Sequence, residues 1–405
     1  MDEKTRFFIL QHRDDDVRQL ALRGGKDTAI DMPFALDQIR GWQVARSKVP
    51  SWAATDGIIY PSHLSLEQCS SEVTAQYKAT LVGEGDRFVD LTGGMGVDFS
   101  FMSRPFRERV YVERNNELCA IAEQNFKQLA LDATIVNTTA EEYLQQMEPA
   151  DVVFLDPARR DSHGGRTYGI ADCTPNVLQL LPTLKQKARK VILKLSPMLD
   201  WHKAVEELGD TVSEVHVVST GNECKELLLV LGSEAVEDVK VFCINDEQRF
   251  EFSGGTRSSR STSISSLTSI SSISCDTSSC FLYEPNASIM KAGCFELVAQ
   301  HYGVVALAPN SHLFVSEEFV EDFPGRSFAI AAISQMNKQS LKQHLQGIKQ
   351  ANIAVRNYPE SVATLRKRLK ISDGGDTYIF ATTLSNGERR LFICKKVNLI
   401  MRNLC

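Results

Sequence analysis

Between residues 86 and 232 the sequence alternates short β-branched runs with longer amphipathic segments, which restricts the fold more than any other feature. The strand-like runs are, in order, RFVDL, RVYVE, ATIV, DVVFL, KVILKL, SEVHVVS and ELLLVL. Helix-like segments such as NNELCAIAEQNFKQLAL and NVLQLLPTLKQKA lie between them. This alternation is typical of βαβ units, in which helices cover both faces of a parallel sheet. We therefore predict an α/β fold with a Rossmann-like sheet of seven strands.

The last two of these runs are joined by TGNECK, which is too short for a helical crossover. Parallel neighbours need a long connection, whereas antiparallel strands need only a turn. We predict that the last strand is reversed and that the pair forms a hairpin at the edge of the sheet.

Composition changes along the chain predict four regions. The stretch SGGTRSSRSTSISSLTSISSISCDTSSC is about half serine and has too little large apolar surface to fold, so it should be mobile. Its pair Cys275 and Cys280 lies in a polar tract and is attributed to chance. The predicted regions are a helical one at 1–85, the α/β domain at 86–232, a small linking domain at 233–325 with the insertion at 253–280, and an α+β domain at 326–405.

Positive charge is concentrated at the C-terminal end. From Arg326 onward there are 14 Lys and Arg against 4 Asp and Glu, a balance of +10 that leaves −16 for the rest of the chain. A basic domain on an acidic body indicates a polyanionic partner, and nucleic acid is the one we favour. Four basic residues in LRKRLK are expected to share one helix and contact phosphates: Arg366, Lys367, Arg368 and Lys370.

Other features limit the setting in which the protein acts. The N-terminal segment lacks an apolar core typical of a signal peptide, and no apolar run approaches the ~20 residues needed to span a bilayer. We expect a cytoplasmic protein without a membrane partner. The cysteines are scattered and the histidines show no ligand spacing, so no metal is predicted.

Polar residues follow three of the predicted strands. The first is followed by DLTGGMGVD, the second by VERN and the fourth by LDPARRD. In open parallel sheets, ligands bind beyond the carboxyl ends of the strands. Glu113 is placed to accept hydrogen bonds from a ribose diol, and the glycines allow close approach of a ligand to the backbone. Dinucleotide-binding proteins use G-x-G-x-x-G instead, which this chain lacks.

Together these motifs resemble those of class I S-adenosylmethionine-dependent methyltransferases. Nearly the whole chain, except the serine tract, is similar to a bacterial family of such enzymes with a THUMP-like C-terminal domain. The shared motifs include LSLEQCSSEVTAQYKA, DLTGGMGVD, FLDPARRD, KLSPMLDW, EPNASIMKAG and the LRKRLK tail. The resemblance implies S-adenosylmethionine as cofactor and an RNA-binding tail, with tRNA or rRNA as substrate. The cofactor residues it implies are Asp90, Thr92, Gly94, Gly96, Glu113 and Thr139.

Two of these positions depart from the common pattern. Thr92 replaces the first glycine of D-x-G-x-G-x-G. No Asp follows the third strand, where an Asp often meets the adenine amine, so Thr139 or Asn137 would have to substitute.

DPAR resembles the [D/N]-P-P-[aromatic] signature of enzymes that methylate amino nitrogens of nucleobases. Asp156 and Pro157 keep its first two positions, with Asp156 as the acceptor of hydrogen bonds from the amine. Arg159 replaces the aromatic residue, so stacking on the base falls to Arg159 or Tyr168. Lys194 and Ser196, which follow the fifth strand, are expected to line the substrate pocket.

The DPxR pattern is also similar to that of uridine C5 methyltransferases. Uridine C5 methylation would require a cysteine nucleophile, and neither Cys173 nor Cys224 lies in a recognisable motif for it. The enzyme could instead methylate a protein or a small molecule. The chain could also be a binding protein that has lost turnover.

Overall fold

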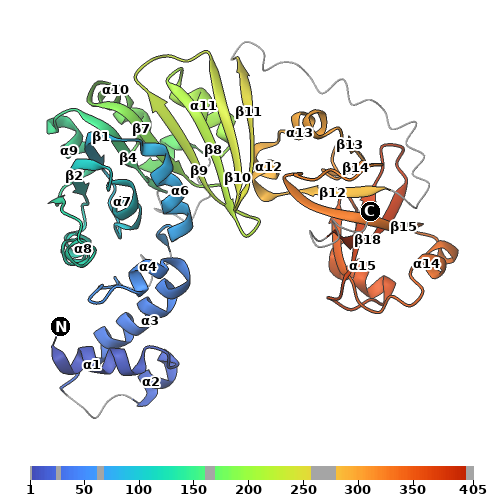
Figure 1. The fold of residues 1–405 in the computed structure, drawn as a ribbon, viewed down its shortest axis with the longest axis horizontal. Helices are drawn as coiled ribbons and strands as arrows, with labels where there is room; N and C mark the ends of the chain where they lie inside the picture. The colour runs from blue at the N-terminus through green and yellow to red at the C-terminus, as the bar shows by residue number, and fades with distance from the viewer. Residues whose placement is uncertain (1, 24–28, 62–67, 160–168, 257–279, 398–405) are drawn as a thin grey trace. The chain divides into compact units, whose positions relative to one another are not determined.

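The computed structural model describes residues 2–23, 29–61, 68–159, 169–256 and 280–397. The chain divides into two compact units, one comprising residues 1–220 and 225–239 and the other residues 221–224 and 240–405. Tyr168 and residues 257–279 of the predicted serine-rich insertion lie outside the described residues. Figure 1 shows the elements of both units.

The first unit begins with helices, as predicted. They are α1 (Glu3–His12), α2 (Val17–Arg23), α3 (Met32–Lys48), α4 (Pro50–Ala53) and α6 (Glu72–Val82). Side chains cap four of them: Asp2 accepts from Thr5 N–H, Asp16 from Arg18 N–H, Asp31 from Phe34 N–H, and Ser71 from Thr74 N–H. Buried residues of α3, α4 and α6 pack with Met95 and Val97, so the helical region supports the loop after the first strand.

The sheet agrees with the predicted α/β class. Its strands are β1 (Gly85–Asp90), β2 (Phe106–Val112), β3 (Thr134–Val136), β4 (Ala150–Leu155), β7 (Ala188–Leu195), β8 (Val212–Thr220), β9 (Glu223–Gly232), β10 (Asp238–Asn245) and β11 (Gln248–Thr256). Their order is β11-β10-β8-β9-β7-β4-β1-β2-β3. β1 pairs in parallel with both β2 and β4, β2 pairs in parallel with β3, and β4 with β7.

The sheet is larger than the seven strands predicted. β9 is antiparallel to β7, which confirms the reversed last strand, but it lies between β7 and β8. The β8–β9 pair is not at the edge because β10 follows β8 in the strand order. The sequence VFCINDEQRFEF predicts the hairpin of β10 and β11, but nothing local specifies which strand that hairpin pairs with.

Helices separate the parallel strands along the chain. They are α7 (Val97–Met102), α8 (Asn116–Gln128), α9 (Ala140–Gln146), α10 (Val177–Lys187) and α11 (Trp201–Leu208). Between β4 and α10 lie β5 (Ala158–Arg159), the 3₁₀ turn η1 (Ile170–Asp172) and β6 (Cys173–Thr174). Phe88, Phe99, Tyr111 and Phe126 are fully or nearly fully buried and form the aromatic centre of this core.

The second unit contains a sheet of seven strands. Its strands are β12 (Phe281–Pro285), β13 (Val305–Ala306), β14 (Phe314–Ser316), β15 (Gly325–Gln335), β16 (Asn352–Arg356), β17 (Thr377–Thr383) and β18 (Arg389–Lys396). Its helices are α12 (Ala287–Ala292), α13 (Phe295–Tyr302), α14 (Lys338–His344) and α15 (Val362–Leu369). The order of strands is β13-β14-β12-β15-β18-β17-β16. From β15 onward the elements are β15, α14, β16, α15, β17 and β18, which is a mixture of strands and helices.

One carboxylate joins three strands of the second unit. Glu284 on β12 is 3% exposed and accepts hydrogen bonds from Arg326 on β15 and from Arg356 on β16. A buried carboxylate is stable only where it is paired, so these two guanidinium groups are required for the fold at this point.

Candidate active site

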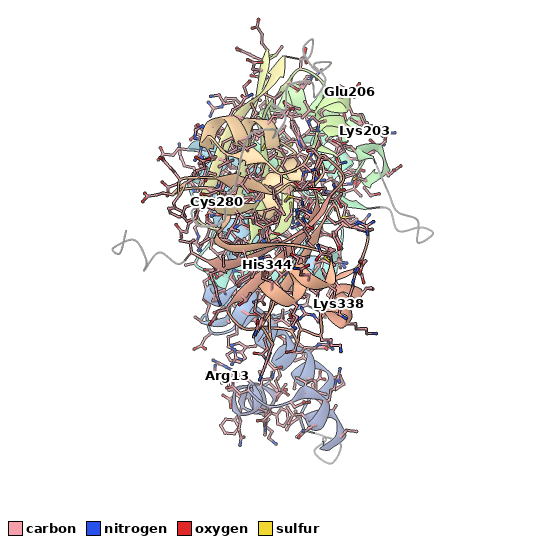
Figure 2. All side chains as sticks on the ribbon, turned by 90° about the vertical axis from the view of Figure 1, so that its right-hand side faces the viewer. Arg13, Lys203, Glu206, Cys280, Lys338 and His344 are labelled. Carbon is pink, nitrogen blue, oxygen red and sulfur yellow. The ribbon has the colours of Figure 1, made fainter. Side chains whose placement is uncertain are left out.

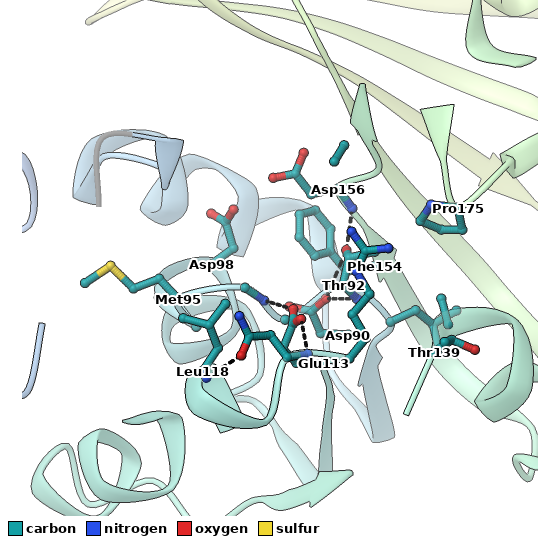
Figure 3. A pocket seen from close by; sticks show the side chains of 18 of the residues that line it. Asp90, Thr92, Met95, Asp98, Glu113, Leu118, Thr139, Phe154, Asp156 and Pro175 are labelled. Carbon is teal, nitrogen blue, oxygen red and sulfur yellow. Dashed lines mark hydrogen bonds between the residues drawn. The ribbon is translucent and has the colours of Figure 1, made fainter. Parts of the chain in front are cut away.

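Three carboxylates lie at the carboxyl ends of neighbouring strands. Asp90 ends β1, Glu113 follows β2, and Asp156 follows β4. All three line one cavity of about 740 Å³, shown in Figure 3. The same cavity is lined by Thr92, Gly94, Gly96 and Thr139. The structure therefore brings together Asp156 and all six residues predicted to bind the cofactor.

The loop between β1 and α7 depends on glycine at two positions. Gly96 is in the left-handed region with φ +83°, and a Cβ there would lie 2.8 Å from the Phe126 ring. At Gly93 a Cβ would lie 2.1 Å from the ring of Tyr111. Any side chain would displace a buried aromatic ring, so the loop keeps its path only without one.

The hydrogen bonds of Thr92 show why this position departs from the glycine of the common motif. Its hydroxyl accepts a hydrogen bond from the Asp156 backbone N–H at 2.6 Å. Its own N–H donates to Asp90 Oδ1 at 2.9 Å. One side chain thus connects the end of β1 to the end of β4, which a glycine at position 92 could not do.

Asp90 is almost inaccessible, with 1% of its surface exposed. Burial raises the pKa of this carboxyl well above its usual value, although the hydrogen bond from Thr92 N–H partly opposes the shift. Asp98, Asp156 and Glu113 add to the rise in pKa because their negative charges lie nearby. This end of the cavity is therefore short of positive charge.

Glu113 faces the glycine loop. It accepts hydrogen bonds from Gly94 N–H at 2.9 Å and from Asn115 N–H at 2.8 Å. The N-terminus of α8 is capped by Asn115, whose side chain accepts from Glu117 and Leu118 N–H. Glu113 is therefore not the helix cap, and its carboxylate is held at the cavity instead.

The two residues considered after β3 have different surroundings. Thr139 lines the cavity and caps α9, forming a capping box with Glu142. Asn137 donates to the Glu113 carbonyl at 2.8 Å and does not line the cavity. Position therefore favours Thr139 as the contact of a ligand.

The Asp156 carboxylate forms an ion pair with Lys194. Lys194 Nζ lies 2.5 Å from Asp156 Oδ2, and the Asp156 side chain is 39% exposed toward the cavity. Burial opposes the charge of Lys194, but Asp156 and Asp98 outweigh burial and raise its pKa. Lys194 itself does not line the cavity and reaches it through Asp156.

Two other residues predicted for this site, Pro157 and Ser196, are not among the residues that line the cavity. Pro157 is buried and does not line the cavity, whereas Ala158 does. Arg159 belongs to β5, which pairs with β6, and its side chain lies outside the described part of the structure. Ser196 follows β7, and its hydroxyl accepts from Met198 N–H at 3.3 Å. It is also absent from the cavity wall.

Sequence reasoning missed Asp98, the last residue of DLTGGMGVD. It lines the cavity and is 9% exposed. Burial alone would raise its pKa, but Lys78 and Lys194 outweigh burial and bring the pKa below its usual value. The charged residues in DLTGGMGVD and SSEVTAQYKA were visible signals, but only the fold shows that they meet.

The predicted phosphate contacts are only partly free. Arg366 donates to Asp373 and to the Ala351 carbonyl, and Arg368 donates to Glu360. Lys367 is exposed on α15. Lys370 lies beyond the helix, because α15 ends at Leu369 and the next residue has a left-handed backbone with φ 58°. The prediction that all four residues share one helix is therefore wrong at Lys370.

Within the described ranges, no group of three or more His, Cys, Asp or Glu side chains is arranged to hold a metal ion. None of the described helices combines the length and the apolar character needed to cross a membrane.

Three family models match parts of the chain. Residues 72–164 match the model of Conserved hypothetical protein 95, residues 281–324 a ferredoxin-like domain, and residues 325–396 a THUMP domain-like model. No curated protein matches the chain.

A solved structure from Porphyromonas gingivalis W83, described as a "putative methyltransferase", is 34% identical to the chain. The match covers 98% of this chain and 100% of that one, with a TM-score of 0.84. The M. capricolum protein TrmK, solved with S-adenosyl-homocysteine, is 11% identical over 43% of this chain and 70% of its own, with a TM-score of 0.32. At these values the second structure has no bearing on the function of this chain.

Proposed function

The chain belongs to a class I methyltransferase family with a THUMP-like C-terminal domain, and we propose that this S-adenosylmethionine-dependent enzyme methylates RNA. The observation that carries the proposal is one cavity with carboxylates at three neighbouring strand ends, in a chain that also has a THUMP domain-like module. We assign methyl transfer to the domain at residues 86–232 and RNA binding to the domain at residues 326–405.

The residues around the cavity fit the cofactor. S-adenosylmethionine carries an ammonium, a sulfonium and a ribose diol, and when bound it supplies an electrophilic methyl group. Among the described residues, neither Asp90 nor Glu113 forms an ion pair with a Lys or Arg side chain, so both carboxylates can serve a cationic or hydroxyl-bearing ligand. We assign the ribose diol to Glu113, the ammonium end to Asp90 and the adenine to Thr139. The glycine loop lets the ligand approach the backbone.

The acceptor is assigned to the open side of Asp156. With Oδ2 on Lys194, Oδ1 remains to accept a hydrogen bond from the group to be methylated. An amino nitrogen of a nucleobase supplies such a donor and presents its lone pair to the methyl group once it is oriented, which is chiefly a matter of positioning. Stacking of the base by Arg159 or Tyr168 stays a prediction from the sequence.

Exposed lysines of the second unit supply the charge that RNA requires. They include Lys338 and Lys342 on α14, Lys349 after it, and Lys367 and Lys370 at the end of α15. Figure 2 shows Lys338 extending outward from its helix. Because phosphate neutralisation dominates nucleic-acid affinity, these side chains are the expected contacts.

Two measurements test the proposal. Nucleosides of RNA from a strain lacking the gene, analysed by mass spectrometry, should lack one methylated base that the purified enzyme restores with S-adenosylmethionine. Asp156→Ala serves as the inactive control. Methyl transfer to protein or to a small molecule, with none to RNA, would contradict the proposed substrate. Absence of heat on titration with the cofactor would identify a binding protein that has lost the site.

A further inference from the structure

Five charged side chains of alternating sign run from inside the first unit to the cavity. They are Glu226 on β9, Lys78 on α6, Asp98 on α7, Lys194 on β7 and Asp156 after β4. Lys78 Nζ lies 2.5 Å from Glu226 and 3.1 Å from Asp98. Lys194 Nζ lies 3.7 Å from Asp98 and 2.5 Å from Asp156. We call this set the charge ladder.

The charge ladder is closed at one end and open at the other. The side chains of Lys78 and Glu226 are 0% and 4% exposed, whereas that of Asp156 is 39% exposed. Unpaired charges are costly in an interior, so each buried member depends on its neighbours. Removing a charge at the closed end therefore changes the electrostatic interactions of the next charged side chain, because burial excludes the water that would screen it.

Lys194 stands between two carboxylates that compete for it. Asp156 holds it at 2.5 Å, while Asp98 Oδ2 is 3.7 Å away. The same Asp98 Oδ2 accepts a hydrogen bond from the Ser70 hydroxyl at 2.7 Å, and Asp98 Oδ1 meets Lys78. Because the Ser70 hydroxyl donates to Asp98 and the Lys78 ammonium forms an ion pair with it, Lys194 is held more closely by Asp156. If Ser70 and Lys78 were absent, Asp98 would attract Lys194 more strongly. The distance between Lys194 and Asp98 would then shorten, and their Coulomb attraction would increase further.

We propose that Lys78, Ser70 and Asp98 are positioning residues that decide which carboxylate Lys194 holds, and thereby fix Asp156 for the acceptor. The part played by Asp156 in catalysis rests on the proposed function, whereas the competition for Lys194 does not. None of the three needs to touch the acceptor. Each acts through Lys194.

The test uses a double variant of the full chain, Lys78→Met with Glu226→Gln. Replacing Lys78 alone would leave Glu226 buried without its cation, and the paired change removes one charge of each sign. Lys194 should then move toward Asp98 and release Asp156. We expect kcat to fall about tenfold to a hundredfold, as small displacements of reacting groups do, while the affinity for S-adenosylmethionine stays within a few fold.

Adding Asp98→Asn to the double variant removes the competitor. Lys194 should return to Asp156, and kcat should recover a large part of the loss. Ser70→Ala is the milder variant, because it frees the Asp98 oxygen that faces Lys194 without removing a charge; it should lower kcat in the same direction by a smaller factor.

The matched control is Tyr77→Phe, next to Lys78 on α6. It removes the contact of the Tyr77 hydroxyl with His216 Nδ1 at 2.8 Å, which joins α6 to β8 outside the charge ladder. It should keep kcat even where the melting temperature falls.

A second readout does not depend on turnover. The carboxyl ¹³C signal of Asp156, assigned by its loss in Asp156→Asn, should shift in the double variant and return in the triple variant. If wild-type enzyme methylates no RNA, the proposed function fails and this signal alone decides. An unmoved signal in both the double variant and Ser70→Ala, or a triple variant slower than the double one, would overturn the competition.

Discussion

Thr92→Val tests whether one hydroxyl holds the two strand ends of the site together. Valine keeps the branched shape, but the Asp156 N–H, now 2.6 Å from the Thr92 hydroxyl, loses its acceptor. Leaving a partly buried donor unpaired costs about 1–3 kcal/mol. For a unit of this size, that loss corresponds to a fall in melting temperature of about 2–12 °C. Because Asp156 also loses its backbone anchor, methyl transfer should fall about tenfold or more.

Differential scanning calorimetry and single-turnover kinetics measure these two effects, and Thr92→Ser is the matched control. Serine retains the hydroxyl, so its turnover should remain within a few fold of wild type and its melting temperature should lie above that of the valine variant. If serine and valine behave alike, the bridge from β1 to β4 contributes nothing and the threonine requires another explanation.

Four further outcomes follow from the site and the basic module. Burial raises the pKa of Asp90, so the folded state loses stability as pH rises from the unfolded pKa through the folded one. Asp90→Asn should therefore raise the melting temperature of ligand-free protein at pH 7 and reduce that pH dependence. In isothermal titration, both Asp90→Asn and Glu113→Gln should weaken cofactor binding by about 1–3 kcal/mol, and unchanged affinity in both would refute the assignment. Asp156→Ala should keep the cofactor affinity but lose about 10²–10⁴-fold in kcat, and near-normal turnover would make the motif structural. Replacing Lys367 and Lys370 by Ala should reduce the slope of log affinity for RNA against log salt by up to about 0.7–0.9 per contact, and an unchanged slope would exclude them as phosphate contacts.

The order of elements was predictable because it depends on local periodicity. β1, β2, β4 and β7 appear where β-branched runs occur, and the ends of β1, β2 and β4 carry the predicted carboxylates. The pairing of the β10–β11 hairpin was not predictable, since strand order depends on contacts between distant segments. The helix of LRKRLK was predicted one residue too long, because Lys370 takes a left-handed backbone at its end.

The same distinction separates the predicted part of the site from the rest. Asp90, Glu113 and Asp156 follow strands, so a rule about strand ends finds them. Lys78 and Glu226 are 148 residues apart, and neither belongs to a motif that names the other as partner. Thr92 looked like a defect in the glycine motif because its own partner lies 64 residues later.

The pairing of Glu284 with Arg326 and Arg356 has an evolutionary consequence. The ferredoxin-like match ends at residue 324 and the THUMP domain-like match begins at residue 325, yet β12 and β15 pair across that boundary. A recombination breakpoint there would separate the buried carboxylate of Glu284, inherited from one parent, from the guanidinium groups of Arg326 and Arg356, inherited from the other. Lineages that exchange modules should therefore transmit residues 281–396 as a single heritable block.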